Sequence, residues 1–144
     1  MVDTFSRRQR SKIMRAVRSS GTSPEKTCEH LMQIARIRYR KHPKNLPGHP
    51  DFILPNVGVA VFVHGCFWHG HKGCEHSSLP SSNVKYWTEK IGRNQRRDRR
   101  VLRWLRKAGW RTAVLWECKL WNSESITRRL LKLSQPLSGG KKLR

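Results

Sequence analysis

Few residues of this 144-residue chain could do chemistry, because only nine acids stand against 31 Lys and Arg. Asp51 follows Pro50 at the expected start of an apolar strand, where metal-dependent nucleases often hold an acidic ligand, although Pro-Asp is also typical of a turn. The next strand ends at His64 and lacks the second acid and the lysine of the common nuclease pattern. His64 and His69 could instead supply a general base beside a metal-bound water, because imidazole titrates near neutral pH.

Asp98 is the one acid inside the basic run 93–100. It could simply pair with a neighbouring Arg, but helical spacing places it on the stripe of Ile91 and Leu105, which faces the body of the protein. An inward carboxylate needs a partner, and a His or a hydrated metal ion would serve. Glu25 begins an expected helix, where the helix dipole explains an acid without any further role.

A metal site is indicated by three ligands within nine residues, Cys66, His71 and Cys74, with the spacing C-x4-H-x2-C. Cys118 ends a later expected strand and would be the fourth ligand if that strand neighbours the strand over 57–63. Three thiolates and one imidazole form a closed structural zinc site. The alternative is that the cysteines are buried apolar residues. The crowding of four of the seven His into this part of the chain favours zinc.

Phe67 and Trp68 lie between an expected metal ligand and His69. Large aromatic residues on a metal-bound loop could act as wedges that unstack a DNA duplex. They could equally pack beneath the zinc loop, and the sequence does not decide between the two.

The elements that must position these residues follow from hydrophobic spacing. Valines alternate over 57–63 and predict a strand with one valine face, which forms a hairpin with the strand over 50–54. A third strand is expected over 112–116. Helices are expected over 24–40, 84–107 (broken near Gly92) and 123–133. The order predicts an α/β fold, a mixed sheet flanked by helices.

The remaining segments are basic. Residues 1–20 are expected to form an N-terminal DNA-binding arm with a short amphipathic helix. Residues 21–134 form the main domain, and residues 135–144 form a flexible basic tail.

The net charge of +22 indicates a polyanionic partner, most simply nucleic acid. This charge far exceeds the ~2–8 that solubility needs in a small domain. No apolar run approaches the ~18–20 residues of a membrane span. The first residues carry no apolar signal segment, so we expect a cytoplasmic protein without disulfides.

Several blocks of this chain closely resemble, in the right order, the very short patch repair endonucleases, the Vsr family. These blocks are RSKIMRA (10–16), LPGHPDF (46–52), FVHGCFWH (62–69), WTEKIGRN (87–94), RRDRR (96–100), GWR (109–111) and WEC (116–118). The resemblance implies a restriction-endonuclease-like fold with a central mixed sheet. It also implies a Mg²⁺-dependent enzyme that nicks DNA on the 5′ side of the T in a T:G mismatch left by deamination of 5-methylcytosine. We further expect a monomer at the bacterial nucleoid, assisted by a MutL-type repair protein.

The resemblance also assigns catalytic roles residue by residue. Asp51 would be the Mg²⁺ ligand, together with the backbone carbonyl of Val63. His69 would be the general base that acts on the attacking water. His64 and Asp98 would support a second hydrated metal ion or the leaving phosphate.

Other implied roles concern the outer shell, zinc and the duplex. Glu25 would contribute from outside the first metal shell. Structural zinc would be held by Cys66, His71, Cys74 and Cys118. Phe67 and Trp68 would enter DNA from the major groove, and Met14 in the arm would reach the minor groove.

Two other classes of protein fit part of the sequence. A non-catalytic zinc-containing DNA- or RNA-binding module explains the charge and the cysteines. It leaves Asp51, His64, His69 and Asp98 without a reason. A ribosome-associated basic protein explains the charge alone.

Overall fold

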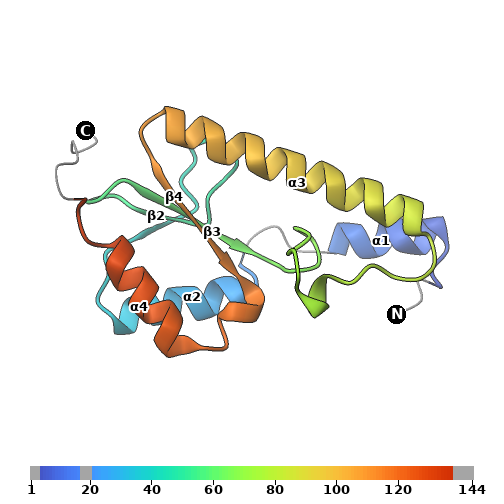
Figure 1. Cartoon of the computed structure of the whole chain (residues 1–144), viewed down its shortest axis with the longest axis horizontal. Helices are drawn as coiled ribbons and strands as arrows, with labels where there is room; N and C mark the ends of the chain where they lie inside the picture. The colour runs from blue at the N-terminus through green and yellow to red at the C-terminus, as the bar shows by residue number, and fades with distance from the viewer. Residues whose placement is uncertain (1–3, 17–20, 138–144) are drawn as a thin grey trace.

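The computed structural model describes residues 4–16 and 21–137, and the side chains of residues 13–16 lie outside the described part. Its helices are α1 (Arg7–Ala16), α2 (Ser23–Ile34), α3 (Val84–Lys107) and α4 (Ser123–Leu133), with short 3-10 helices η1 (Glu75–Ser77) and η2 (Glu117–Lys119). Its strands are β1 (Arg40–Lys41), β2 (Phe52–Leu54), β3 (Val59–His64) and β4 (Arg111–Trp116). Figure 1 shows α3 along one side of the sheet and α2 with α4 along the other. The predicted mixed α/β sheet between helices is confirmed.

The four strands lie in the order β1-β2-β3-β4. The predicted hairpin is confirmed, since β2 pairs antiparallel with β3. After the α3 crossover, β4 pairs parallel with β3, and His64 lies opposite Trp116. Parallel strands end at the same edge of a sheet, so the residues that follow β3 and β4 come close together. β1 is a two-residue strand that hydrophobic spacing does not predict.

The core has one part on each face of the sheet, as the alternation in β3 predicts. Val59 and Val61 pack with α2 and α4 in the larger cluster, which also contains the fully buried Cys28. Ala60 and Phe62 face α3. The period of two along β3 therefore assigns each residue to a face.

Two predictions about the helices are wrong: where the helix over 24–40 ends, and that the helix over 84–107 is broken. The helix expected over 24–40 ends at Ile34, because Arg36 adopts a left-handed backbone with φ 55°. The N–H groups of Arg36 and Ile37 then bond back to Gln33 and Met32, which is a Schellman ending. Ile37 is buried after this turn, so its apolar side chain serves the core from outside the helix.

The break expected near Gly92 is also absent, since α3 is continuous over 24 residues. Gly92 costs a helix interior about 1 kcal/mol relative to Ala. Burial of Trp87, Ile91 and Leu105 along the same helix offsets that cost.

A helix, α1, is present in the segment expected to form the arm, and the apolar residues on which its predicted amphipathic character rests lie outside the described side chains. The guanidinium of Arg10 lies 4.6 Å from the centre of the Tyr86 ring on α3. The division into arm, domain and tail stays a prediction. Within the described ranges, no helix is long and apolar enough to cross a membrane.

Candidate active site and metal centre

The five residues predicted to be catalytic line one cavity of about 690 Å³ between the sheet edge, α2 and α3. We call them the cavity cluster: Glu25, Asp51, His64, His69 and Asp98. They come from α2, the start of β2, the end of β3, the following loop and the middle of α3. The fold thus collects residues that lie up to 73 positions apart (98 minus 25) around one space.

His69 and Asp98 form a close pair on the α3 side of the cavity. His69 Nδ1 lies 2.7 Å from Asp98 Oδ2, whereas the nearest guanidinium nitrogen of Arg97 is 4.0 Å from Asp98. Burial alone would raise the pKa of Asp98, but the hydrogen bond and charge of His69 hold this pKa below its ordinary value. A carboxylate on Nδ1 orients the ring and leaves Nε2 to exchange a proton with a substrate.

His64 lies flat against His69. Their ring centres are 3.8 Å apart and the planes differ by 4°. His64 is buried, and burial, followed by the charge of His69, lowers its pKa to about 4. His64 is therefore a neutral imidazole at pH 7, able to donate or accept one hydrogen bond at each nitrogen according to its tautomer.

Asp51 and Glu25 form a second pair in the cavity, with ligand oxygens within 4.8 Å of each other. Asp51 Oδ2 accepts a 2.7 Å hydrogen bond from the backbone N–H of Val63. Burial and the negative charge of Glu25 raise the pKa of Asp51 to about 7, against the pull of that N–H. Two carboxylates that repel each other in this way are a site that a cation would stabilise.

Glu25 has the helix-end role that its position predicts. It lies three residues after the N-cap Thr22, and its Oε2 accepts a 2.8 Å bond from the N–H of Gly21. Its side chain is nevertheless buried against the cavity.

His42 contacts the same acid, with Nε2 3.1 Å from Glu25 Oε2. The sequence prediction missed His42, because this residue begins a loop and no spacing pattern links it to residue 25.

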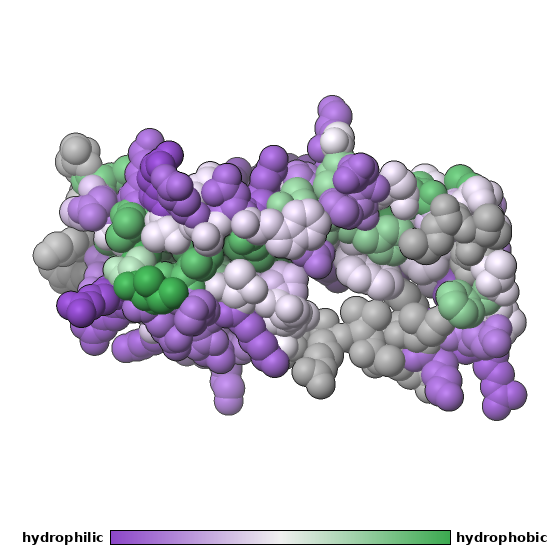
Figure 2. All heavy atoms as spheres, turned by 90° about the horizontal axis from the view of Figure 1, so that it is seen from below, coloured by the Kyte–Doolittle hydropathy of each residue, from purple (hydrophilic) through white to green (hydrophobic). Residues whose placement is uncertain are grey.

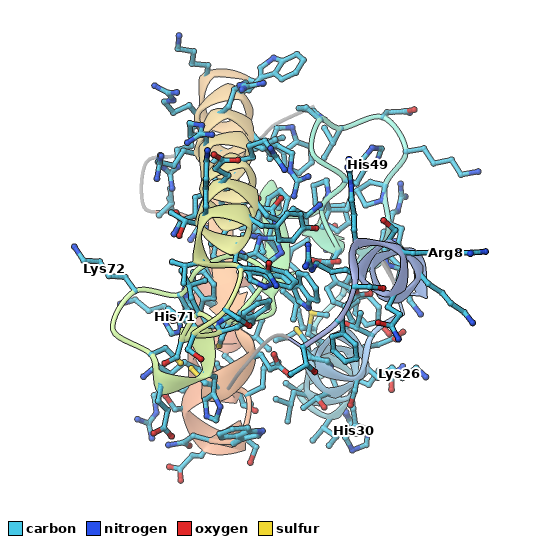
Figure 3. The ribbon with its side chains drawn as sticks, turned by 90° about the vertical axis from the view of Figure 1, so that its right-hand side faces the viewer. Arg8, Lys26, His30, His49, His71 and Lys72 are labelled. Carbon is cyan, nitrogen blue, oxygen red and sulfur yellow. The ribbon has the colours of Figure 1, made fainter. Side chains whose placement is uncertain are left out.

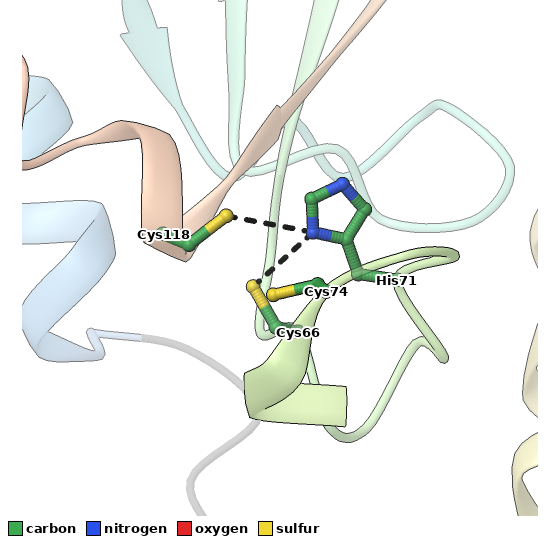
Figure 4. A group of neighbouring side chains, drawn as sticks. All are labelled: Cys66, His71, Cys74 and Cys118. Carbon is green, nitrogen blue, oxygen red and sulfur yellow. Dashed lines mark hydrogen bonds between the residues drawn. The ribbon is translucent and has the colours of Figure 1, made fainter. Parts of the chain in front are cut away.

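The cysteine cluster consists of four residues at the neighbouring end of the sheet, Cys66, His71, Cys74 and Cys118 (Figure 4). The Sγ atoms of Cys66 and Cys118 each lie 3.5 Å from His71 Nδ1. A tetrahedral zinc ion with its usual bond lengths sets sulfur and nitrogen ligands about 3.6 Å apart, so the donor set and its spacing fit zinc.

The protonation of the cysteine cluster also suits a cation. Burial and the neighbouring thiols raise the pKa of Cys66 to about 12, and burial lowers the pKa of His71. The imidazole is thus neutral and ready to ligate, while the Cys66 thiol needs a metal ion to become a thiolate. The His71 ring is stacked on Trp116 with centres 4.1 Å apart.

Phe67 and Trp68 are half-buried and pack against a third ring, Trp87 of α3, which the residue patterns did not single out. The ring centres of Phe67 and Trp87 are 5.4 Å apart, and those of Trp68 and Trp87 are 6.2 Å apart. Asn94 Nδ2 donates to the Trp68 carbonyl at 2.8 Å, which fixes the loop to α3. These rings pack against the start of α3, outside both core clusters.

The remaining predicted contact residue is Met14, which lies on α1 but whose side chain is outside the described part. Cationic side chains surround the site on several elements. In Figure 3, Arg8 of α1 and Lys26 of α2 point outward on one side, and Lys72 points outward on the other. Figure 2 shows hydrophilic side chains along both long margins of the face that it presents. Positive groups on two sides suit a polyanion that crosses the molecule.

Comparison with known proteins matches this chain to one family. A family model described as DNA mismatch endonuclease Vsr matches residues 2–76. The chain is 43% identical over 136 residues to the Type II nicking enzyme V.XorIIP of Xanthomonas oryzae pv. oryzae, covering 94% of this chain and 99% of that protein. It is 38% identical over 131 residues to the DNA mismatch endonuclease Vsr of Escherichia coli (strain K12), covering 91% and 83% respectively.

The fold is also similar to that of a solved structure, the catalytic domain of the homing endonuclease I-Bth0305I. The TM-score is 0.53 at 19% sequence identity, and the similarity covers 78% of this chain and 94% of that domain. At this level of identity the likeness concerns the fold alone. It supports the endonuclease-like architecture that the sequence predicts.

Proposed function

This chain belongs to the Vsr family of DNA mismatch endonucleases and is a DNA-nicking endonuclease, and we propose that its substrate is duplex DNA with a T:G mismatch. The nick falls on the 5′ side of the T, where 5-methylcytosine has deaminated, and Mg²⁺ is the cation. One observation carries the proposal: the hydrogen-bonded His69–Asp98 pair and the Asp51–Glu25 pair line the same cavity.

Asp51, with the backbone carbonyl of Val63, would bind Mg²⁺ directly, and Glu25 would help to hold the ion from outside its first shell. The fit rests on the donor set, because ligand oxygens of Asp51 and Glu25 lie within 4.8 Å of each other, and burial with the charge of Glu25 raises the pKa of Asp51. A bound Mg²⁺ supplies Lewis-acid stabilisation of the negative charge that develops on the phosphate.

His69 accepts the proton of the attacking water at Nε2. Asp98 holds Nδ1 and stabilises the imidazolium that forms, which is the same division of labour as in other carboxylate–histidine pairs. Neutral His64 supports the flat face of His69 and, with Asp98, faces the leaving phosphate or its hydrated cation.

The cysteine cluster would bind one structural zinc ion, and so hold the loop that carries Phe67, Trp68 and His69. Phe67 and Trp68 then enter the duplex from the major groove beside the mismatch, and the arm with Met14 enters the minor groove. The excess of cations sets affinity for phosphate and its dependence on salt. We expect a monomer at the nucleoid, assisted by a MutL-type repair protein.

The test is incubation of the protein and Mg²⁺ with duplexes labelled on either strand and carrying a single T:G mismatch. We expect one nick 5′ to the T and none in the same duplex with a C:G pair. The mismatch is placed in several methyltransferase recognition sequences, because contacts with the surrounding bases decide which sequences the enzyme cuts.

Asp51→Ala should bind the same duplex without cutting it, since the carboxylate serves the cation and the arm and cationic surface serve the DNA. Equal cutting of T:G and C:G duplexes by the wild type would disprove the mismatch specificity. Full activity of Asp51→Ala would disprove the assignment of the cation site.

A further inference from the structure

His42 touches both carboxylate residues of the cavity. Its Nε2 lies 3.1 Å from Glu25 Oε2, and its backbone N–H donates to the Asp51 carbonyl at 3.0 Å. Ligand atoms of His42, Glu25 and Asp51 all lie within 4.8 Å of one another. The three side chains therefore offer one nitrogen and two carboxylate oxygens to a common point.

The backbone brings His42 to this point at a cost. His42 directly follows β1 and has a left-handed φ of 44°, a region that only a few per cent of non-glycine residues adopt, Asn, Asp and His more often than the others. Pairing of Lys41 with Phe52 and the bond from the His42 N–H to Asp51 hold it there. Strained backbone that the surroundings hold in place is concentrated at functional sites.

A purely structural role for the imidazole is weaker, because Glu25 already has a partner. The N–H of Gly21 donates to the same Oε2 at 2.8 Å, so the buried carboxylate does not depend on His42 for a hydrogen bond. In a chain with 31 Lys and Arg, a full cation would also neutralise Glu25 better than an imidazole does. What an imidazole offers beyond these groups is a lone pair for a metal ion.

We propose that His42 is a nitrogen ligand of the cation held by Glu25 and Asp51, and that it makes this site select Mn²⁺ over Mg²⁺. The inference rests on the proposed function, in which these acids hold the cation for nicking. Mg²⁺ takes oxygen ligands almost exclusively, whereas divalent transition metals accept imidazole. The site therefore works with Mg²⁺ and binds Mn²⁺ more tightly.

The test measures metal binding directly, without DNA, on the full zinc-loaded chain. Mn²⁺ is titrated in and the free ion is followed by electron paramagnetic resonance, and Mg²⁺ affinity is obtained by competition. We expect Mn²⁺ to bind at least about ten-fold more tightly than Mg²⁺, the scale on which changes around a metal site alter affinity.

Two variants separate a ligand from a hydrogen-bond partner. His42→Asn tolerates the left-handed backbone but is too short to reach the cation. His42→Gln keeps a donor for Glu25 and loses the ring nitrogen. Both should lose the preference for Mn²⁺, and His42→Gln should keep its Mg²⁺ affinity within about three-fold. Circular dichroism checks that both are folded.

His30→Asn is the control, because His30 is exposed on α2, lies outside the cavity lining and belongs to none of the metal-ligand groups. Its Mn²⁺ affinity should equal that of the wild type. Asp98→Asn removes a ligand from the other histidine group, His64, His69 and Asp98, and should leave the His42-dependent Mn²⁺ site intact.

Equal weakening of Mn²⁺ and Mg²⁺ in the His42 variants would mean that His42 only positions Glu25, and unchanged binding would mean that it does neither. Either result overturns the proposal. The nicking assay is separate: Mn²⁺ selectivity that depends on His42 in a protein that cuts no T:G duplex would retain this site and reject the proposed function.

Discussion

The cysteine cluster and the cavity cluster lie at the same edge of the sheet and differ in what their ligand atoms face. In the cysteine cluster, Cys66 and Cys118 both lie 3.5 Å from His71, so the donors face one another. In the cavity cluster, the donors line a space of about 690 Å³. A closed donor set can only hold a metal ion, whereas an open one has room for a substrate.

The difference follows from how each cluster is assembled. β3 and β4 end side by side, and the loop after β3 supplies both His69 to the cavity and His71 to the cysteine cluster. Successive histidines of one loop therefore serve opposite purposes. A metal ion that fixes His71 also fixes the position of His69.

The largest effect that separates the clusters should come from Cys118→Ser. We expect this variant to lose its zinc, about one ion per chain in the wild type, and to melt roughly 10 °C lower or more, because a structural zinc contributes several kcal/mol to folding. Metal analysis after dialysis and thermal melts measure both.

Cys28→Ala is the control for Cys118→Ser, since Cys28 is fully buried in the core and outside any metal group. It should keep its zinc and cost only about 1–2 kcal/mol of stability. A Cys118→Ser protein that retains zinc and melts normally would show that the cysteine cluster is merely packed.

The next effect should be confined to the cavity. Asp98→Asn removes the carboxylate charge that stabilises the His69 imidazolium, and its amide NH₂ can donate to Nδ1 and select the wrong tautomer. The nicking rate at saturating duplex should therefore fall about 10²–10⁴-fold. Zinc content and duplex affinity should stay within about three-fold of the wild type. Quenched-flow nicking, metal analysis and gel shifts measure the three quantities.

Glu124→Gln is the matched acid control, because Glu124 is exposed on α4 and pairs with Arg128. It should nick at the normal rate. Loss of zinc or of fold in Asp98→Asn, in proportion to its lost activity, would argue that Asp98 supports the structure rather than the proton transfer.

The cysteine cluster was the easier of the two to predict, because three of its four residues lie within nine positions of the chain. The spacing of Cys66, His71 and Cys74 indicates metal by itself. Cys118 required a guess about strand pairing, which the parallel β3–β4 ladder bears out.

The cavity cluster could be predicted only in parts. Asp98 stood out as an acid in a basic helix, and family resemblance supplied the roles of Asp51 and His69. The sequence did not predict that His42 joins the site, because its contact with Glu25 depends on a left-handed backbone and on the turn that ends α2 early. Hydrophobic spacing carries no information on either feature.

A smaller effect is expected in how the free energy of unfolding depends on pH. Burial and the charge of Glu25 raise the pKa of Asp51 from 3.8 to about 7, so the folded chain keeps a proton there that the unfolded chain releases. The contribution of Asp51 to the free energy of unfolding falls as pH rises from about 4 to about 7 and is constant above pH 7. At pH 8 and without added cation, Asp51→Asn should be about 2–4 kcal/mol more stable than the wild type.

The difference in stability between Asp51→Asn and the wild type should vanish near pH 4, where both side chains are neutral. His64 has the opposite pH dependence, because burial lowers its pKa from 6.5 to about 4. Its contribution to the free energy of unfolding is lost as pH falls through that window. Asp51→Asn should therefore become steadily more stable from pH 4 to 6.5. Thermal melts across this range measure it, and a gap that does not change with pH would contradict the assignment.

The smallest effect should show whether the two clusters are coupled through Trp116. Its ring is stacked on His71 at 4.1 Å and meets the edge of His64 at 5.3 Å, so it touches one residue of each cluster. Aromatic contacts of this kind contribute about 0.5–1.5 kcal/mol. Trp116→Leu should release zinc to a chelator several-fold faster and slow nicking several-fold. Trp116→Phe should change both less. Faster zinc release with normal nicking would mean that the cysteine cluster holds the loop without affecting His64 and His69, because the perturbation would then stop at His71.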